Sequence, residues 1–228
     1  MTNAEILEKI KGGLIVSCQA LEEEPLHSSF IMGRMAYAAY LGGAVGIRCN
    51  SVADIREIKT TVSLPLIGII KKDYPGSSVR ITPTIEEVDA LMAEGVSIIA
   101  MDATDRVRPD GKTISETFPQ IRAKYPQQLF MADCSTYEDA RRAETLGFDL
   151  VGTTLYGYTE QTQGLTPPSF EFIRSLAQGI GKPIIAEGGI WSPQQLRTAM
   201  DQGVHACVVG SAITRPMEIT QRYVSALK

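Results

Sequence analysis

Eight short apolar runs recur along this chain of 228 residues, and longer amphipathic segments separate them. The runs are apolar nearly throughout and rich in β-branched residues, which is typical of strands buried on both faces of a parallel sheet. An alternating pattern would instead predict a sheet with one face in water. We expect strands at residues 14–18, 44–48, 66–70, 97–102, 129–133, 150–154, 183–187 and 206–210.

The segments between these runs carry helix-start signals. Thr84 with Glu87 and Thr136 with Asp139 have the spacing of capping boxes, and Ser192 precedes a proline, which is favoured at the first helical position. Several of the segments end at a glycine just before the next apolar run. The clearest helices are expected at residues 51–60, 84–94, 136–146 and 192–201.

Eight successive strand–helix units predict one fold above others. They indicate an α/β protein of the (β/α)8 TIM-barrel type, with residues 1–228 forming a single domain. Such barrels need roughly 250 residues, with about 200 as the lower limit. The alternative is a doubly wound open sheet, which usually needs fewer strands, and the first strand here lacks the GxGxxG turn of that fold.

Charge and composition exclude several classes of partner. The net charge is -4, whereas nucleic acid and anionic membranes favour basic surfaces, so we expect neither as a partner. No apolar stretch suits a secretory signal or approaches the roughly 20 residues of a membrane span, so we expect a cytoplasmic protein. The scattered Cys18, Cys49, Cys134 and Cys207 form no CxxC pair, which favours reduced thiols over disulfides or zinc.

Polar residues gather where the predicted strands end. In a (β/α)8 barrel the active site lies at the carboxyl ends of the strands. Lys71 and Glu187 adjoin the deepest apolar runs and are therefore the candidates for chemistry. We interpret Asp102 as a loop or capping residue, because a charge-rich loop follows it. The other polar residues at strand ends are Gln19, Arg48, Asp133, Thr153 and Thr154, and Thr153 is a candidate substrate contact.

Glycine follows the seventh and eighth predicted strands, at Gly188, Gly189 and Gly210, and Ser211 comes next. Glycine lets the backbone approach an oxyanion closely, and a helix beginning just beyond points its free N–H groups at that anion. Barrels of this type frequently bind phosphate between these two loops. We therefore predict a phosphate site here, with Arg215 as a phosphate partner or, alternatively, as a solvated residue at a helix start.

Metal chemistry is not expected. The two histidines, His27 and His205, do not lie at predicted strand ends, which argues against a histidine metal site or a catalytic triad. Asp102 and Asp133 could hold a metal with waters, but nothing in the sequence requires one. The loop 156–159 after the sixth strand either covers a sugar, with Tyr158 in contact, or is an ordinary loop.

Several stretches resemble the N-acetylmannosamine-6-phosphate 2-epimerase family, of the NanE type. They include IGIIKKDY at 67–74, MDATDRVRP at 101–109, IAEG at 185–188 and VVGSAITRP at 208–216, and the resemblance runs over nearly the whole chain. It implies interconversion of N-acetyl-D-mannosamine 6-phosphate and N-acetyl-D-glucosamine 6-phosphate in sialic acid breakdown, without a cofactor. It also implies the site residues: catalytic Lys71 with Glu187 as its partner, sugar contacts at Gln19, Arg48 and Asp133, and a phosphate site at Gly189, Gly210, Ser211 and Arg215.

The two sugars differ at C2, whose proton is removable when C1 is an aldehyde. The reaction needs a base and a group that stabilises the enolate oxygen. A free lysine, with a pKa of about 10.4, is a poor base at neutral pH. We expect burial and a neighbouring cation, Arg48 or Lys72, to lower the pKa of Lys71, and Glu187 to oppose them. Our hypothesis has Lys71 serve both faces of C2; the alternative gives one face to Glu187.

Two other functions fit the same residues. Lys71 could attack a carbonyl as a Schiff-base aldolase, or the barrel could be a non-catalytic sensor of phosphosugars. Ribulose-phosphate-type epimerases use histidine-bearing metal sites, which this chain lacks. The segment 218–227 carries apolar residues that either close the barrel or pack on a second copy in a homodimer.

Overall fold

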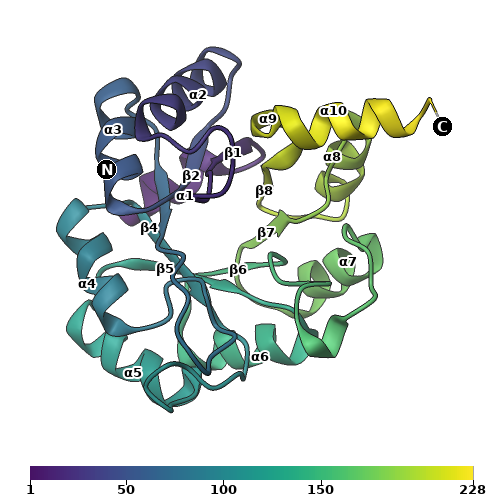
Figure 1. Cartoon of the computed structure of the whole chain (residues 1–228). Helices are drawn as coiled ribbons and strands as arrows, with labels where there is room; N and C mark the ends of the chain where they lie inside the picture. Colours follow the sequence, from purple (N-terminus) through teal and green to yellow (C-terminus); the bar gives the residue numbers. More distant parts are fainter. Residues whose placement is uncertain (228) are drawn as a thin grey trace.

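The computed structural model describes residues 1–227 as a closed barrel of eight parallel strands, shown in Figure 1. Neighbours along the chain pair in turn, and the last strand pairs with the first. The predicted (β/α)8 barrel is therefore confirmed. The strands are β1 (Leu14–Cys18), β2 (Gly46–Asn50), β3 (Leu66–Ile69), β4 (Ile98–Asp102), β5 (Leu129–Asp133), β6 (Leu150–Gly152), β7 (Ile184–Glu187) and β8 (Ala206–Val209).

Helices surround the barrel and begin where the capping signals predict. Thr84 and Thr136 complete capping boxes, and the Ser192 hydroxyl caps the helix that opens at the next residue. Within residues 1–227, no helix combines the length and apolar character that a bilayer crossing needs. The helices are α1 (Asn3–Ile10), α2 (Ser29–Leu41), α3 (Val52–Thr61), α4 (Ile85–Glu94), α5 (Ile114–Lys124), α6 (Tyr137–Leu146), η1 (Glu160–Thr162), α7 (Phe170–Gly179), α8 (Pro193–Met200), α9 (Ser211–Thr214) and α10 (Pro216–Ser225).

Two strand boundaries differ from the prediction in a way that matters for the site. β2 begins and ends two residues later than expected, so Arg48 lies inside the strand and Asn50 ends it. The apolar run does not reveal where pairing begins; Asn50 still pairs with Ile69 of β3. β6 ends at Gly152, so Thr153 and Thr154 lie just beyond the strand.

The barrel interior is closed at the end opposite the carboxyl ends of its strands. Ile6 and Ile10 of α1 belong to the interior cluster, together with Ile15, Ile67 and Ile98 from the strands. Burying a side chain of this size contributes roughly 1.5–3 kcal/mol. A second apolar layer lies between the strands and the surrounding helices. With this end filled by apolar side chains, the polar mouth is the end left for a ligand.

α10 extends from the body of the molecule, as the yellow helix of Figure 1 shows. No residue of α10 is buried, and Tyr223 and Leu227 near its end are 77% and 88% exposed. The barrel is closed by the pairing of β8 with β1, so α10 is not needed to close it.

Candidate active site

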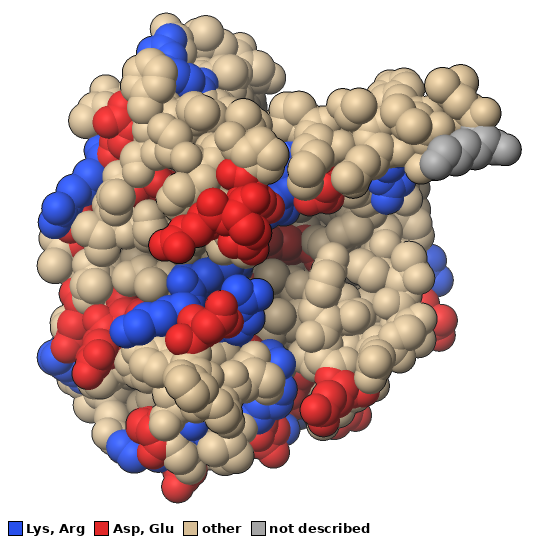
Figure 2. All heavy atoms as spheres, viewed as in Figure 1, with Lys and Arg blue, Asp and Glu red and all other residues tan. Residues whose placement is uncertain are grey.

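A cavity of about 450 Å³ opens at the carboxyl ends of the strands. Lys71 and Glu187 both line it, as do Thr154 and Gln19. Figure 2 shows the hollow beside α10, with acidic and basic side chains around it. The structure therefore brings the two predicted catalytic residues into one cavity.

Lys71 follows β3 and is held by its backbone. Its N–H donates to the Asn50 side-chain oxygen at 2.7 Å, and it forms an isolated bridge with Ile81 across the following hairpin. Burial, followed by the positive charges of Arg48 and Arg215, lowers the pKa of the Lys71 amine to about 8, while the negative charge of Glu187 acts in the other direction. A useful fraction of this lysine is neutral near physiological pH, as a general base requires.

Arg48 lowers the pKa of Lys71 as expected, but Lys72, the other cation considered, is not among the groups that lower it. Its side chain is half-exposed, lies 3.4 Å from the Glu87 carboxylate and covers the ring of Tyr74. The second cation is Arg215, which the sequence placed only at the phosphate. Arg215 follows the last strand, so only closure of the barrel brings it near β3.

Arg48 crosses the barrel beneath the cavity and binds two carboxylates. Its guanidinium makes two hydrogen bonds to Asp133, of 2.6 and 3.2 Å, and lies 3.1 Å from Glu187. Arg48 and Asp133 are fully buried and do not line the cavity, although the sequence predicts sugar contacts for both. The Thr154 hydroxyl lies 2.7 Å from Asp133 and 3.1 Å from Glu187. Arg48 thus pairs with both carboxylates, and the Thr154 hydroxyl lies within hydrogen-bonding distance of both.

Glu187 is the carboxylate of this cluster that lines the cavity. Burial raises its pKa above the ordinary value, and the negative charge of Asp133 raises it further, while Arg48, Thr154 and Lys71 act in the other direction. A carboxyl group with a raised pKa is closer to the operating pH than an ordinary glutamate, so it suits proton transfer.

The remaining predicted sugar contacts lie at different depths. The Thr153 hydroxyl donates to the Glu187 carbonyl oxygen at 2.7 Å and accepts from its N–H at 2.9 Å; it does not line the cavity. Gln19 does line it, and its side-chain oxygen has no hydrogen-bond partner within residues 1–227, while its amide nitrogen donates to Ser17. Tyr158 lines the cavity and is 64% exposed.

The glycine loops lie together along one side of the cavity. Gly188 and Gly189 have φ values of 100° and 67°, and a Cβ on Gly189 would collide with the main chain of Pro167. Ser211 opens α9, and its hydroxyl accepts from Arg215 at 3.1 Å. All four loop residues, Gly210 included, line the cavity with Arg215. The arrangement suits a phosphate group.

Arg215 is held in place rather than solvated. Its Nε donates to Glu24 at 2.8 Å, and only a quarter of the side chain is exposed. Among the described residues, no three His, Cys, Asp or Glu side chains gather in a way that could hold a metal ion.

Comparison with known proteins identifies the family. The family model NanE, described as "Putative N-acetylmannosamine-6-phosphate epimerase", matches residues 32–228. The chain belongs to the NanE family. A NanE-family relative from Enterobacter sp. (strain 638), named "Putative N-acetylmannosamine-6-phosphate 2-epimerase", is 55% identical over 98% of this chain and 96% of its own length. A relative of the same name from Listeria monocytogenes serotype 4b (strain F2365) is 52% identical, covering 98% and 97%.

Solved structures agree with the NanE assignment. The N-acetylmannosamine-6-phosphate 2-epimerase from Clostridium perfringens superposes with a TM-score of 0.92 at 49% identity, covering 97% of this chain and 96% of that one. A thiamine phosphate pyrophosphorylase from Pyrococcus furiosus shares only the fold, with a TM-score of 0.62 at 16% identity. The family resemblance expected from the sequence motifs is confirmed.

Sequence reasoning missed two residues of this NanE-family site. Asn50, which holds the Lys71 backbone, was hidden because the second strand was placed two residues too early. Thr154 was recognised at a strand end, but nothing local distinguished it from Thr153. Just beyond the end of β6, the Thr154 side chain reaches the carboxylates and the Thr153 side chain reaches the neighbouring backbone.

Proposed function

We propose that this chain interconverts N-acetyl-D-mannosamine 6-phosphate and N-acetyl-D-glucosamine 6-phosphate by inverting C2, in amino-sugar catabolism in the cytoplasm. The observation that carries the proposal is a lysine with a pKa of about 8 in one cavity with a carboxyl group of raised pKa. The names printed for the NanE-family relatives support the choice of substrate.

Lys71 and Glu187 divide the chemistry in this proposal. The neutral Lys71 amine removes the C2 proton of the open-chain sugar; the C–H electron pair forms the C1=C2 bond, and the C1 oxygen becomes an enolate oxygen. Protonated Glu187 then returns a proton to the opposite face. The opposite pKa shifts support this two-residue route over the route in which Lys71 serves both faces.

The buried ion pair prepares Glu187 for this role. Arg48 makes two hydrogen bonds to Asp133 and lies 3.1 Å from Glu187, so two carboxylates share one positive charge. The Thr154 hydroxyl has one proton and two carboxylate neighbours, so it donates to one at a time. When it donates to Asp133, Glu187 loses a hydrogen bond that favours its ionised form.

Phosphate binding orients the substrate. The phosphate lies against Gly188, Gly189, Gly210 and Ser211, where Arg215 contributes a positive charge. The unpaired oxygen of Gln19 accepts a hydrogen bond from the sugar, and Tyr158 covers the opening. Positioning of this kind contributes up to about 7–11 kcal/mol, in addition to the roughly 10²–10⁴-fold from the proton transfers.

The test is turnover of N-acetylmannosamine 6-phosphate in D₂O, followed by proton NMR. The wild-type chain should form N-acetylglucosamine 6-phosphate with deuterium at C2, and Lys71→Ala should bind the substrate without converting it. Near-complete labelling in one turnover supports two residues, whereas retention of the original proton supports Lys71 alone. A borohydride-trapped adduct on Lys71, or no epimerisation by the wild type, would contradict the proposal.

We further propose that two copies associate through α10 as a homodimer. Support comes from the exposed apolar side chains Met217, Tyr223 and Val224 on a helix that has no fully buried residue. A two-fold axis would let these surfaces cover one another. Light scattering should give twice the 24.8 kDa chain mass, and Tyr223→Glu with Val224→Glu should halve it. A wild-type mass equal to one chain would exclude the dimer.

A further inference from the structure

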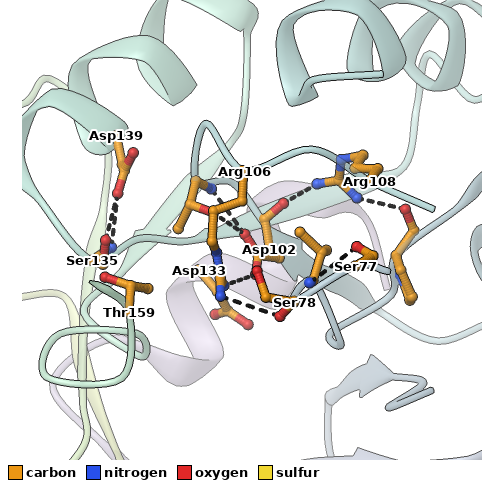
Figure 3. Close-up of polar contacts among 12 residues, drawn as sticks. Ser77, Ser78, Asp102, Arg106, Arg108, Asp133, Ser135, Asp139 and Thr159 are labelled. Carbon is orange, nitrogen blue, oxygen red and sulfur yellow. Dashed lines mark hydrogen bonds and ion pairs between the residues drawn. The ribbon is translucent and has the colours of Figure 1, made fainter. Parts of the chain in front are cut away.

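Arg106 lies in the loop between β4 and α5 and is held by three different groups, as Figure 3 shows. Its Nε donates to the Thr104 hydroxyl at 2.9 Å, and one terminal nitrogen donates to the Ser78 carbonyl oxygen at 3.2 Å. The other terminal nitrogen lies 2.5 Å from the carboxylate of Asp102. The plane of the guanidinium is therefore defined before any ligand arrives.

The loop itself is fastened to the hairpin that follows β3. The Ser77 hydroxyl donates to the Val107 carbonyl oxygen at 3.0 Å, and Arg108, which is fully buried, donates to the Pro83 carbonyl oxygen at 2.7 Å. Arg106 is thus supported from two loops, and little conformational entropy is lost when it binds a ligand.

Arg106 still has donors to offer. A guanidinium carries five N–H groups, and the three contacts use one on each nitrogen, so one remains on each terminal nitrogen. The side chain is 23% exposed and lines the cavity. Asp102, which is 1% exposed, balances its charge, so the pair offers directed N–H groups without a net charge. Such a pair suits a neutral carbonyl oxygen better than a second anion.

The position of Arg106 in the barrel indicates which carbonyl group of a bound sugar it would meet. In the closed barrel β4 lies four strands from β8, on the side opposite the glycine loops. A sugar 6-phosphate held at those loops, with C2 at Lys71, extends its substituents at C1 and C2 toward β4. The C2 substituent of an N-acylhexosamine carries a neutral amide carbonyl.

We propose that Arg106 binds the carbonyl oxygen of the substrate N-acyl group. Arg106 is then the residue that distinguishes an N-acylated hexosamine phosphate from a plain hexose phosphate. The assignment rests on the proposed function for the placement of the phosphate and of C2. The buried Arg48 and Asp133, which the family resemblance suggested as sugar contacts, lie beneath the cavity and have each other as partners.

The test compares two open-chain alditols by calorimetry, N-acetylglucosaminitol 6-phosphate and glucitol 6-phosphate. Neither can epimerise, because C1 is an alcohol in both. Arg106→Gln should weaken binding of the N-acetylated alditol roughly 10- to 100-fold, the range for one hydrogen bond from a charged donor, and change binding of glucitol 6-phosphate less than threefold. Equal loss for both alditols, or loss for neither, would overturn the assignment.

Two further variants separate recognition from structural damage. Arg142 also pairs with a buried carboxylate, that of Asp139 at 2.9 Å, and has nearly the same exposure as Arg106, but it does not line the cavity. Arg142→Gln should therefore lower stability without changing the preference between alditols. The double variant Asp102→Asn, Arg106→Gln removes both charges of the pair and should still lack the preference; its return would show that Arg106 only neutralises Asp102.

The outcome is independent of the turnover assay. If the wild-type chain does not epimerise N-acetylmannosamine 6-phosphate, the proposed function fails. If it does, and the Arg106→Gln variant keeps its preference for the N-acetylated alditol, only the role of Arg106 fails.

Discussion

Replacing Lys71 with methionine should abolish turnover and make the protein more stable at neutral pH. Lys71 is largely buried, and its pKa falls from 10.5 to about 8 on folding, chiefly because burial disfavours the ammonium form. Below pH 8 the folded protein must therefore hold a charge that the unfolded chain holds more easily in water. Methionine has a similar length and no charge, so this penalty disappears in the variant.

The size of the effect follows from the difference between the two pKa values. One pKa unit corresponds to 1.36 kcal/mol, so the lowered pKa of Lys71 makes folding less favourable by on the order of 3 kcal/mol at pH 7 or below. The penalty shrinks as pH rises through 8 and is gone above the unfolded pKa near 10.5. The stability gained by Lys71→Met should decrease along the same path.

Urea unfolding at pH 6.5, 8 and 10 measures this, because the free energy of unfolding falls linearly with denaturant. The control is Lys72→Met, which alters the next residue; Lys72 is half-exposed and pairs with Glu87, so its effect should stay below about 1 kcal/mol at each pH. Two results would refute the claim that the buried Lys71 charge makes folding less favourable. One is a Lys71→Met variant that is less stable than the wild type at pH 6.5, and the other is equal stabilisation at pH 6.5 and 10.

Three further outcomes follow from the site. The kcat/KM of the wild type should rise roughly fivefold between pH 7 and 8 as neutral Lys71 accumulates, and Arg215→Gln should move this profile to higher pH, because one cation that lowers the Lys71 pKa is lost. Thr154→Val should lower kcat by about tenfold or more with little change in KM, since its hydroxyl joins the two buried carboxylates; a Thr154→Ser variant should recover most of the rate. Gly189→Ala should weaken inhibition by inorganic phosphate and lower the melting temperature, because its Cβ meets the Pro167 main chain at a positive φ.

The barrel was predictable because its signals are local and repeated. A continuous apolar run indicates each strand, and a capping residue such as Thr84 or Thr136 indicates the start of a helix. Alternation of the two restricts the topology to very few arrangements. Strand ends were less certain: a two-residue error in β2 was enough to hide Asn50.

The sequence predicted which residues belong to the candidate site better than it predicted how their side chains are arranged. The barrel rule places strand ends at one mouth, and Lys71, Glu187 and the glycine loops do meet there. The sequence did not predict how deep each side chain lies below the cavity, because this depends on the direction in which the side chain points. Arg48 and Asp133 turn inward and bind one another, and Thr153 faces the backbone.

What the sequence determined by itself was the barrel and the set of residues at its mouth. Both follow from patterns within a few residues of each other. Tertiary structure alone decided how those residues act. Arg48 and Asp133 are 85 positions apart, and Arg215 reaches Lys71 from the far end of the chain. Burial and charge at such distances set the pKa of the base, and they exist only after the barrel has closed.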